Sequence, residues 1–172
     1  MHSDLKNIKD LLFFICGIKI SQVIATNESK EYCAHTFKIN NQNVNFRIAK
    51  ITPTKIGQFV TLWKRNKLGN TSPYSIYDNF DFYIIEVKKE SKYGVFIFTK
   101  PTLYKNGILS DDNKEGKRGF RVYSTWDVTA NKQAKKTQLW QKDCFLELTE
   151  EKQIDVIKAK KLLGITIGCA SK

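Results

Sequence analysis

The sequence predicts a single α/β domain in which helices flank a central β-sheet. Two runs, 82–85 (with Val87) and 95–98, are apolar at successive positions, which is typical of strands covered on both faces in the middle of a sheet. Three segments, 4–16, 53–65 and 131–146, repeat apolar residues at helical spacing. The chain has 172 residues, 41% of them hydrophobic, which suits one domain with an ordinary core.

The N-terminal elements follow from local signals. Residues 4–16 form a predicted helix that Gly17 can end, and its apolar face holds Leu5, Ile8, Leu12 and Ile15. Residues 33–39 and 44–50 form a predicted hairpin joined by Asn40-Asn41-Gln42-Asn43.

Residues 47–65 are predicted to run from a strand into a helix. Thr52 is a good N-cap and Pro53 fits the first helical position. The apolar helix face would hold Ile56, Phe59, Val60 and Trp63. Free N–H groups at this helix start, beside Lys50, would suit an oxyanion or a phosphate. The alternative interpretation is a solvated basic face on an ordinary amphipathic helix.

The C-terminal half alternates strands and helices. A tight turn at 92–94 would join the two apolar strands, and a short helix would begin at Pro101. A charged loop, 110–119, precedes a short strand at 119–123. Asn131 can cap a helix that runs to about Leu146 with a core face of Ala134, Thr137, Trp140, Cys144 and Phe145. Thr149 would cap a last helix that fades near Gly164.

Positive charge is concentrated in two segments. The chain carries 29 Lys and Arg against 17 Asp and Glu, a net charge of +12. Residues 43–67 hold six basic groups and no acid, and residues 100–143 hold ten basic groups and five acids. This excess suggests an anionic partner, nucleic acid first and an anionic membrane surface second. The two segments form one surface only if they meet in the fold.

The sequence lacks the residue patterns that several kinds of catalytic, metal or phosphate-binding site require. The four cysteines are widely spaced and show no zinc-ligand pattern, so they are expected to be reduced thiols in a cytoplasmic protein. Neither His2 nor His35 sits in a catalytic motif, and no phosphate-binding glycine loop occurs. The apolar run 11–15 is too short to span a membrane, so membrane insertion is not expected. No cofactor is predicted, and Mg²⁺ is expected only if the protein is a nuclease.

One triplet, Glu86-Val87-Lys88, could belong to a nuclease. Its acid and lysine share a strand face, as in nucleases of the PD-(D/E)xK type, where the acid holds Mg²⁺ and the lysine orients water. Such a site needs a second carboxylate, and Asp81 falls on the opposite face of the strand unless the strand is irregular. The alternative interpretation is a buried, ion-paired and structural triplet.

Several long blocks resemble the MepB family, in order and from about Tyr32 to about Phe145. They are TPTKIGQFVTLWKR, DFYIIEV, GVFIF, EGKRGFRVY followed by Trp126, and NKQAKKTQLWQ. The resemblance implies an α/β fold with a mixed sheet similar to the restriction-endonuclease-like core. It implies a family domain over 1–148 and a C-terminal helical extension over 149–172. The family is named from a bacterial multidrug-efflux gene cluster, and the resemblance implies no established activity.

Three hypotheses for function remain open from the sequence. The first is a nucleic-acid-binding protein without strong sequence preference, in which Trp126 stacks on bases while Trp63 and Trp140 pack in the core. The second is a nuclease that uses Glu86 and Lys88 with Mg²⁺, and the third is a partner of an efflux-associated regulator or membrane protein. The predicted nucleic-acid contacts are Arg47, Lys50, Thr52, Thr54, Lys55, Gln58, Lys64, Arg65, Lys117, Arg118, Arg121, Tyr123, Trp126, Lys132 and Lys135.

Overall fold

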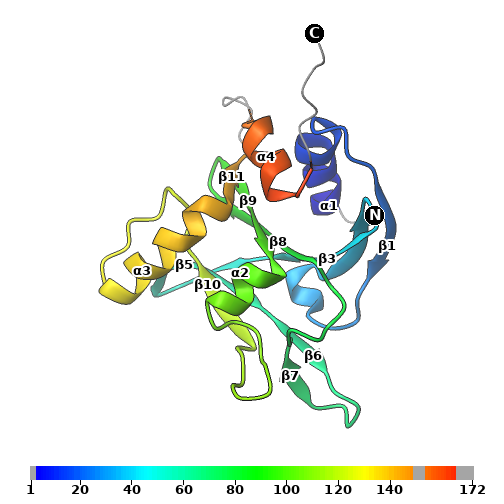
Figure 1. The fold of residues 1–172 in the computed structure, drawn as a ribbon. Coiled ribbons are helices and arrows are strands. Elements are labelled where there is room, and N and C mark those ends of the chain that lie inside the picture. The colour runs from blue at the N-terminus through cyan, green and yellow to red at the C-terminus, as the bar shows by residue number, and fades with distance from the viewer. Residues whose placement is uncertain (1–2, 149–153, 166–172) are drawn as a thin grey trace.

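A six-stranded mixed β-sheet forms the centre of the computed structural model, which describes residues 3–148 and 154–165 (Figure 1). The predicted α/β domain is confirmed. The β3–β8 pair is parallel and every other neighbouring pair is antiparallel. In order across the sheet the strands are β1 (Ile20–Ala25), β2 (His35–Ile39), β3 (Gln42–Ile48), β8 (Phe82–Lys89), β9 (Lys92–Thr99) and β11 (Phe145–Glu147).

Two hairpins build most of this sheet, and both were expected. Asn40 and Asn41 join β2 to β3 with φ angles of 46° and 67°, the left-handed values that a tight two-residue hairpin turn needs. Asn tolerates this conformation better than most residues. β8 and β9 pair along their whole length, from Phe82 opposite Thr99 to Lys89 opposite Lys92. Their central positions are buried on both faces, as the apolar runs predict.

One face of the sheet packs against the two ends of the described chain. The helix α1 (Ser3–Ile8), the π-helical turn η1 (Lys9–Phe14) and the helix α4 (Val156–Leu162) lie on this side (Figure 1). Leu5, Ile8 and Leu12 are buried there, as predicted, and Ala159 and Leu163 join the same core. Asp155 caps α4 through the Lys158 N–H, whereas Thr149 lies outside the described residues.

The prediction for Ile15 is wrong. Its side chain is 48% exposed, and Phe13 is buried in its place. The cause is the wider π turn, in which the backbone bonds over five residues rather than four. The Ile18 N–H donates to the Phe13 carbonyl at 2.8 Å. A wider turn rotates the following side chains away from the face that regular helical spacing assigns to them.

The other face of the sheet carries a second core and the smaller elements. A three-stranded antiparallel sheet, in the order β10-β5-β4, and a separate β6–β7 hairpin extend from it. Phe98, Val60 and Val122 are among the residues of this second core. The elements on this side are β4 (Lys50–Thr52), β5 (Lys55–Thr61), β6 (Trp63–Arg65), β7 (Thr71–Pro73), α2 (Lys100–Lys105), β10 (Gly119–Val122), α3 (Lys132–Gln141) and the short η3 turn (Lys142–Cys144).

The helix predicted over 53–65 does not form. This segment is a hairpin, β4 and β5, followed by β6, and the turn between Thr52 and Lys55 is Pro53-Thr54. Gly57 has a φ of 76°, which a right-handed helix excludes. Val60 and Leu62, two positions apart, are fully buried, whereas Ile56, which the predicted helix would have buried, is 47% exposed.

The two later helices begin where they were predicted. The Thr99 hydroxyl accepts the Thr102 N–H at 3.2 Å at the start of α2. The Asn131 side chain accepts the Ala134 N–H at 2.7 Å at the start of α3. α3 is shorter than expected, because it ends at Gln141 and residues 145–147 form β11 at the sheet edge.

Cys144 is expected to resist alkylation in the folded protein. Burial, with the nearby Asp143 carboxylate, raises the pKa of its thiol to about 11. At pH 8 only about one thiol in a thousand is then the reactive thiolate. Iodoacetamide labelling followed by mass spectrometry should modify Cys144 quickly in guanidinium and slowly in native buffer. Equal rates in the two buffers would show that the β11 region opens readily.

No helix in the described ranges is long and apolar enough to cross a membrane.

Candidate functional site

The two basic segments of the sequence meet in the structure. β5, from the first segment, pairs with β10, from the second, with Val60 opposite Phe120 and Phe59 opposite Arg121. The pairing continues beyond the strand, where the Leu62 N–H donates to the Arg118 carbonyl at 2.8 Å. Basic residues that lie about 60 positions apart in the sequence are therefore neighbours on one small sheet.

Arg121 fastens the three strands of this sheet together. Its Nη1 donates to the Gly57 carbonyl at 3.0 Å and the Ile56 carbonyl at 3.2 Å, and Nη2 donates to the Thr52 hydroxyl. Its guanidinium thus reaches from β10 across β5 to the end of β4. The side chain is partly exposed, so it adds charge to the surface while it holds the strands in register.

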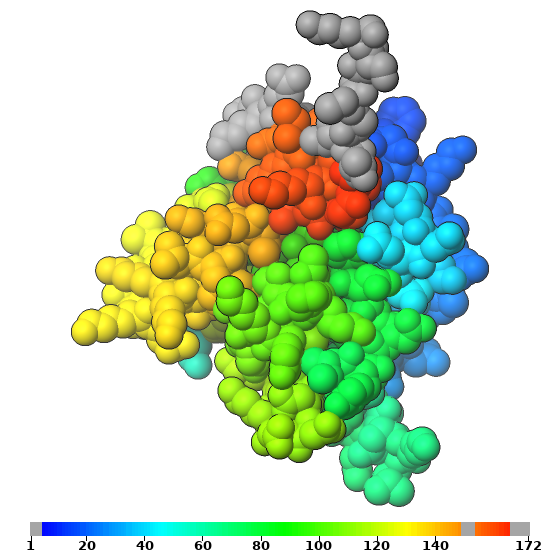
Figure 2. Space-filling model, in the orientation of Figure 1, coloured from blue at the N-terminus to red at the C-terminus, as the bar shows by residue number. Residues whose placement is uncertain are grey.

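A groove of about 850 Å³ lies against β10. Its walls are the end of α2, the 106–117 loop, β10 and α3. Figure 2 shows α2 and the loop after it beside α3 on one face of the molecule. The charged side chains that line the groove within the described ranges are one carboxylate, Asp111, and five basic groups, Lys105, Lys114, Lys117, Arg121 and Lys136.

Gln141 sets the position of the α3 wall. It is fully buried, and its Nε2 donates to the Arg121 carbonyl at 2.9 Å while its Oε1 accepts the Tyr123 N–H at 2.8 Å. The amide side chain therefore bonds the edge of β10 as a further strand would. This fixes one helix face toward the groove, and its members recur at helical spacing: Gln133, Lys136, Thr137 and Trp140.

The groove also has an aromatic lining. Tyr104 is 45% exposed, and its hydroxyl donates to Asp111 at 2.8 Å. Trp140 is half-buried and lies against Phe98, with ring centroids 5.4 Å apart. Tyr123 covers Gly57 and forms part of the same wall.

The Asp111 carboxylate stays ionised at neutral pH. Hydrogen bonds from the Asn113 N–H, the Tyr104 hydroxyl and the Lys114 N–H hold its pKa below the ordinary range. The same bond to Asp111 raises the pKa of Tyr104. Tyr104 is therefore a neutral ring, bonded to Asp111, in the lining of the groove.

Several predicted contacts lie on this surface or next to it. Lys117, Arg121 and Tyr123 line the groove, and Lys132 and Lys135 are exposed on α3. On the neighbouring strands Lys55 and Thr54 are exposed, and Lys50 lies over the Tyr32 ring at 4.8 Å. No helix begins at Pro53, so the predicted anion site at a helix N-terminus is wrong. The Thr52 hydroxyl instead accepts a hydrogen bond from the Arg121 guanidinium.

Two predicted contacts are buried and cannot reach a phosphate. Arg47 is 1% exposed, its Nη1 donates to the Phe46 carbonyl at 2.8 Å and its guanidinium lies over the Tyr83 ring. Gln58 is 3% exposed and donates to the Lys88 carbonyl at 2.9 Å. Both positions fall on strands that are covered on both faces.

The remaining predicted contacts lie around the β6–β7 hairpin. Lys64 is ion-paired with Asp78, and Arg65 is exposed with its Nη1 on the Gly69 carbonyl at 2.8 Å. Arg118 pairs with Glu115 at 2.9 Å and also reaches the Thr71 carbonyl. These cations have protein partners at the edge of the basic surface.

Of the two tryptophans predicted to pack in the core, Trp140 does so and Trp63 does not. Trp63 is not on a helix core face: it is half-buried on β6, with the Arg65 guanidinium 5.6 Å from its ring. Trp126 packs edge-on against Phe145 at 5.1 Å. Trp140 does contact the core and also lines the groove, so it is better placed than Trp126 to meet a ligand.

The triplet forms an ion pair. Glu86 is fully buried and Lys88 Nζ lies 2.9 Å from its Oε1, so the two side chains share a face as predicted. Asp81 precedes β8 and accepts the Asn43 N–H at 2.7 Å, roughly 17 Å along the extended chain from Glu86. Residues 3–148 and 154–165 contain no group of three His, Cys, Asp or Glu side chains placed to hold a metal.

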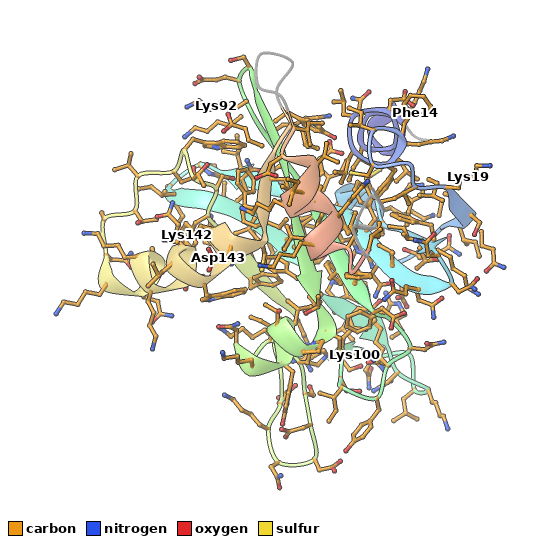
Figure 3. All side chains as sticks on the ribbon, turned by 45° about the horizontal axis from the view of Figure 1, so that its top comes forward. Phe14, Lys19, Lys92, Lys100, Lys142 and Asp143 are labelled. Carbon is orange, nitrogen blue, oxygen red and sulfur yellow. The ribbon has the colours of Figure 1, made fainter. Side chains whose placement is uncertain are left out.

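Sequence reasoning missed four groove residues, Tyr104, Lys105, Lys114 and Lys136. Lys136 had a usable signal, because helical spacing places it on one helix face with Gln133, Thr137 and Trp140. The other three lie on α2 and the loop, which approach α3 only in the folded chain. Not every lysine of this region joins the groove: Lys100, labelled in Figure 3, is directed at the Ile76 and Asp78 carbonyls.

Comparison with known proteins gives one consistent picture. The family described as MepB-like matches residues 26–147. A solved structure, described as the crystal structure of MepB, is 32% identical, with a TM-score of 0.75 over 89% of this chain and 100% of that chain. None of the curated proteins matches the chain.

Proposed function

Because the chain belongs to the MepB-like family and its fold assembles a basic surface beside a groove, we propose that it binds nucleic acid with little sequence preference. The observation that carries the proposal is the β5–β10 pairing, which brings two basic segments of the sequence side by side. An extended array of Lys and Arg is the usual electrostatic footprint of a phosphate backbone.

The type of basic residue in the groove supports binding with weak preference for the nucleic-acid sequence. Four of the five basic groups in the groove are lysines, which act as mobile point charges on phosphate. The guanidinium of the fifth, Arg121, already bonds the protein. Positioning contacts of this sort fix the nucleic acid in place without distinguishing its bases.

We propose that the protein has a restriction-endonuclease-like core, but we do not propose that it is a nuclease. The mixed sheet, with one parallel pair among antiparallel strands, is compatible with such a core. The triplet has its acid fully buried and ion-paired with its lysine, and the described residues include no group of three His, Cys, Asp or Glu side chains placed to hold a metal. Binding is therefore the activity that the geometry supports best.

A salt titration tests the proposal. Fluorescence anisotropy would be measured with labelled oligonucleotides of two unrelated sequences between 50 and 300 mM NaCl. With about four phosphate contacts, log K should fall against log salt with a slope of roughly −3 to −4, since each contact releases condensed counterions. The two sequences should bind alike. Absence of binding at 50 mM salt, or affinity that salt does not change, would overturn the proposal.

A further inference from the structure

The groove combines features that favour one form of nucleic acid. Its volume of about 850 Å³ falls within the usual range for sites that enclose a small molecule. The apolar and aromatic side chains of its lining, among them Tyr104, Phe120 and Trp140, lie between basic groups of opposite walls. Lys105 and Lys117 come from the α2 side and Lys136 from α3.

A duplex cannot use such a lining. Its bases are stacked and paired inside, and it presents phosphates outward, so a duplex would meet only the basic rim. A single strand can turn its bases toward aromatic side chains while its backbone follows the charged walls, which is how proteins bind single strands without sequence preference. Stacking of this kind accepts every base.

Tyr104 is the ring best placed to stack. It is 45% exposed, and the bond from its hydroxyl to Asp111 holds it in place without covering it. A ring that is already held loses little freedom when a base packs on it. The groove is also built on rigid parts, because Gln141 fixes α3 to β10 through two hydrogen bonds.

We infer that the groove between α2, the 106–117 loop and α3 is a site for single-stranded nucleic acid, with a base stacked on Tyr104 and the backbone held by the lysines of both walls. This rests on the proposed nucleic-acid binding and names its ligand class. It also places the contact within the second basic segment, residues 100–143, where α2, the loop and α3 line the groove.

The test compares three ligands and three variants by anisotropy at one salt concentration. The ligands are a labelled DNA 12-mer, the same sequence as RNA, and its DNA duplex, with polyphosphate as unlabelled competitor. The variants are Tyr104→Ala, Tyr104→Phe and Tyr77→Ala. Tyr77 is the matched control, because it is 69% exposed and bonds Asp112 of the same loop at 2.7 Å but does not line the groove.

We expect the single strands to bind more tightly than the duplex. Tyr104→Ala should weaken single-strand binding about 5- to 150-fold, the range for loss of one stacked base. Tyr77→Ala should stay within about twofold of the native protein, below the stacking range. Tyr104→Phe keeps the stacking ring but loses the bond to Asp111 that holds it, so it should weaken binding less than Tyr104→Ala does. Circular dichroism melting of each variant checks that the fold is kept.

The outcomes that would contradict the single-strand inference differ from those that would contradict the proposed function. Duplex binding as tight as single-strand binding, or full affinity in Tyr104→Ala, would overturn the inference and leave the proposed function standing. Polyphosphate that competes as well as an unlabelled single strand would mean that charge alone binds, which also overturns it. Failure of all three nucleic acids to bind at low salt would overturn the proposed function itself.

Discussion

Replacing Gly57 with alanine is expected to lower the free energy of unfolding by about 2–5 kcal/mol, from the left-handed backbone strain and the overpacking together. Gly57 has a φ of 76°, and an added Cβ would lie 2.6 Å from the Tyr123 ring and 2.7 Å from the Val122 carbonyl oxygen. The ring can move aside, but the carbonyl belongs to β10. Relief of the clash must therefore shift the strand pairing that unites the basic segments. Urea denaturation, followed by circular dichroism, measures the change.

Gly69→Ala is the matched control for this change. Gly69 has a φ of 81°, and an added Cβ there would meet nothing within 4 Å. It therefore carries the backbone strain without the contact, and we expect a loss of only about 1–2 kcal/mol. Equal losses for the two variants would mean that the close approach of Gly57 to β10 contributes nothing to stability.

Reversing three groove charges should produce the largest change in binding. With Lys105, Lys117 and Lys136 all changed to Glu, affinity for nucleic acid should fall roughly 100-fold or more at 0.15 M salt, because about three phosphate contacts are lost. The salt slope should shrink by about two to three for the same reason. All three side chains are exposed, so the melting temperature should change little. Anisotropy titrations across a salt series measure both quantities.

A second triple variant controls for net charge. Lys6, Lys9 and Lys19 are also exposed, and they lie in α1, in η1 and just before β1. β1 is the sheet edge opposite β11, which follows α3 and η3 in the chain, and Figure 3 shows Lys19 far from Lys142, the residue after α3. Changing these three lysines to Glu alters the net charge equally. If both triple variants weaken binding to the same extent, overall charge rather than the groove governs affinity.

Elements with strong local signals were predictable from the sequence. Asn40-Asn41 marks a hairpin turn and Asn131 marks a helix start because each acts on backbone groups within a few residues. The apolar runs of β8 and β9 locate the centre of the sheet, because a strand covered on both faces is apolar at successive positions. The ion pair of Glu86 with Lys88 follows from their spacing on one strand.

Residues 53–65 could not be assigned in this way, because their apolar residues fit two periods. Phe59, Val60 and Trp63 suit a helix face, whereas Val60 and Leu62 suit a buried strand face. The partner strand β10 decides between them, and it lies about 60 residues further along the chain. The residues next to 53–65 in the sequence do not include that partner strand. Strand formation depends strongly on such partners.

The site was predictable only in part. Clustered charge indicated the two segments, but a sequence does not say whether separate segments meet or which cations point inward. Arg47 was counted as surface charge, and it is buried because β3 lies in the interior of the sheet between β2 and β8. The groove itself needs α2, the loop and α3 together, so it exists only at the level of tertiary structure.

The long-range pairing of β5 also constrains how the chain can fold. The chain must close the long loop between Phe59 and Arg121 before the β5–β10 contacts can stabilise the fold. The parallel β3–β8 pair requires a similar closure. Domains dominated by such non-local pairs fold slowly compared with helical bundles of similar size. During synthesis, β5 leaves the ribosome well before β10, so one edge of it stays open while the intervening residues are made. Lys55, the first residue of β5, is a charged side chain of the kind that discourages this open edge from pairing with other chains.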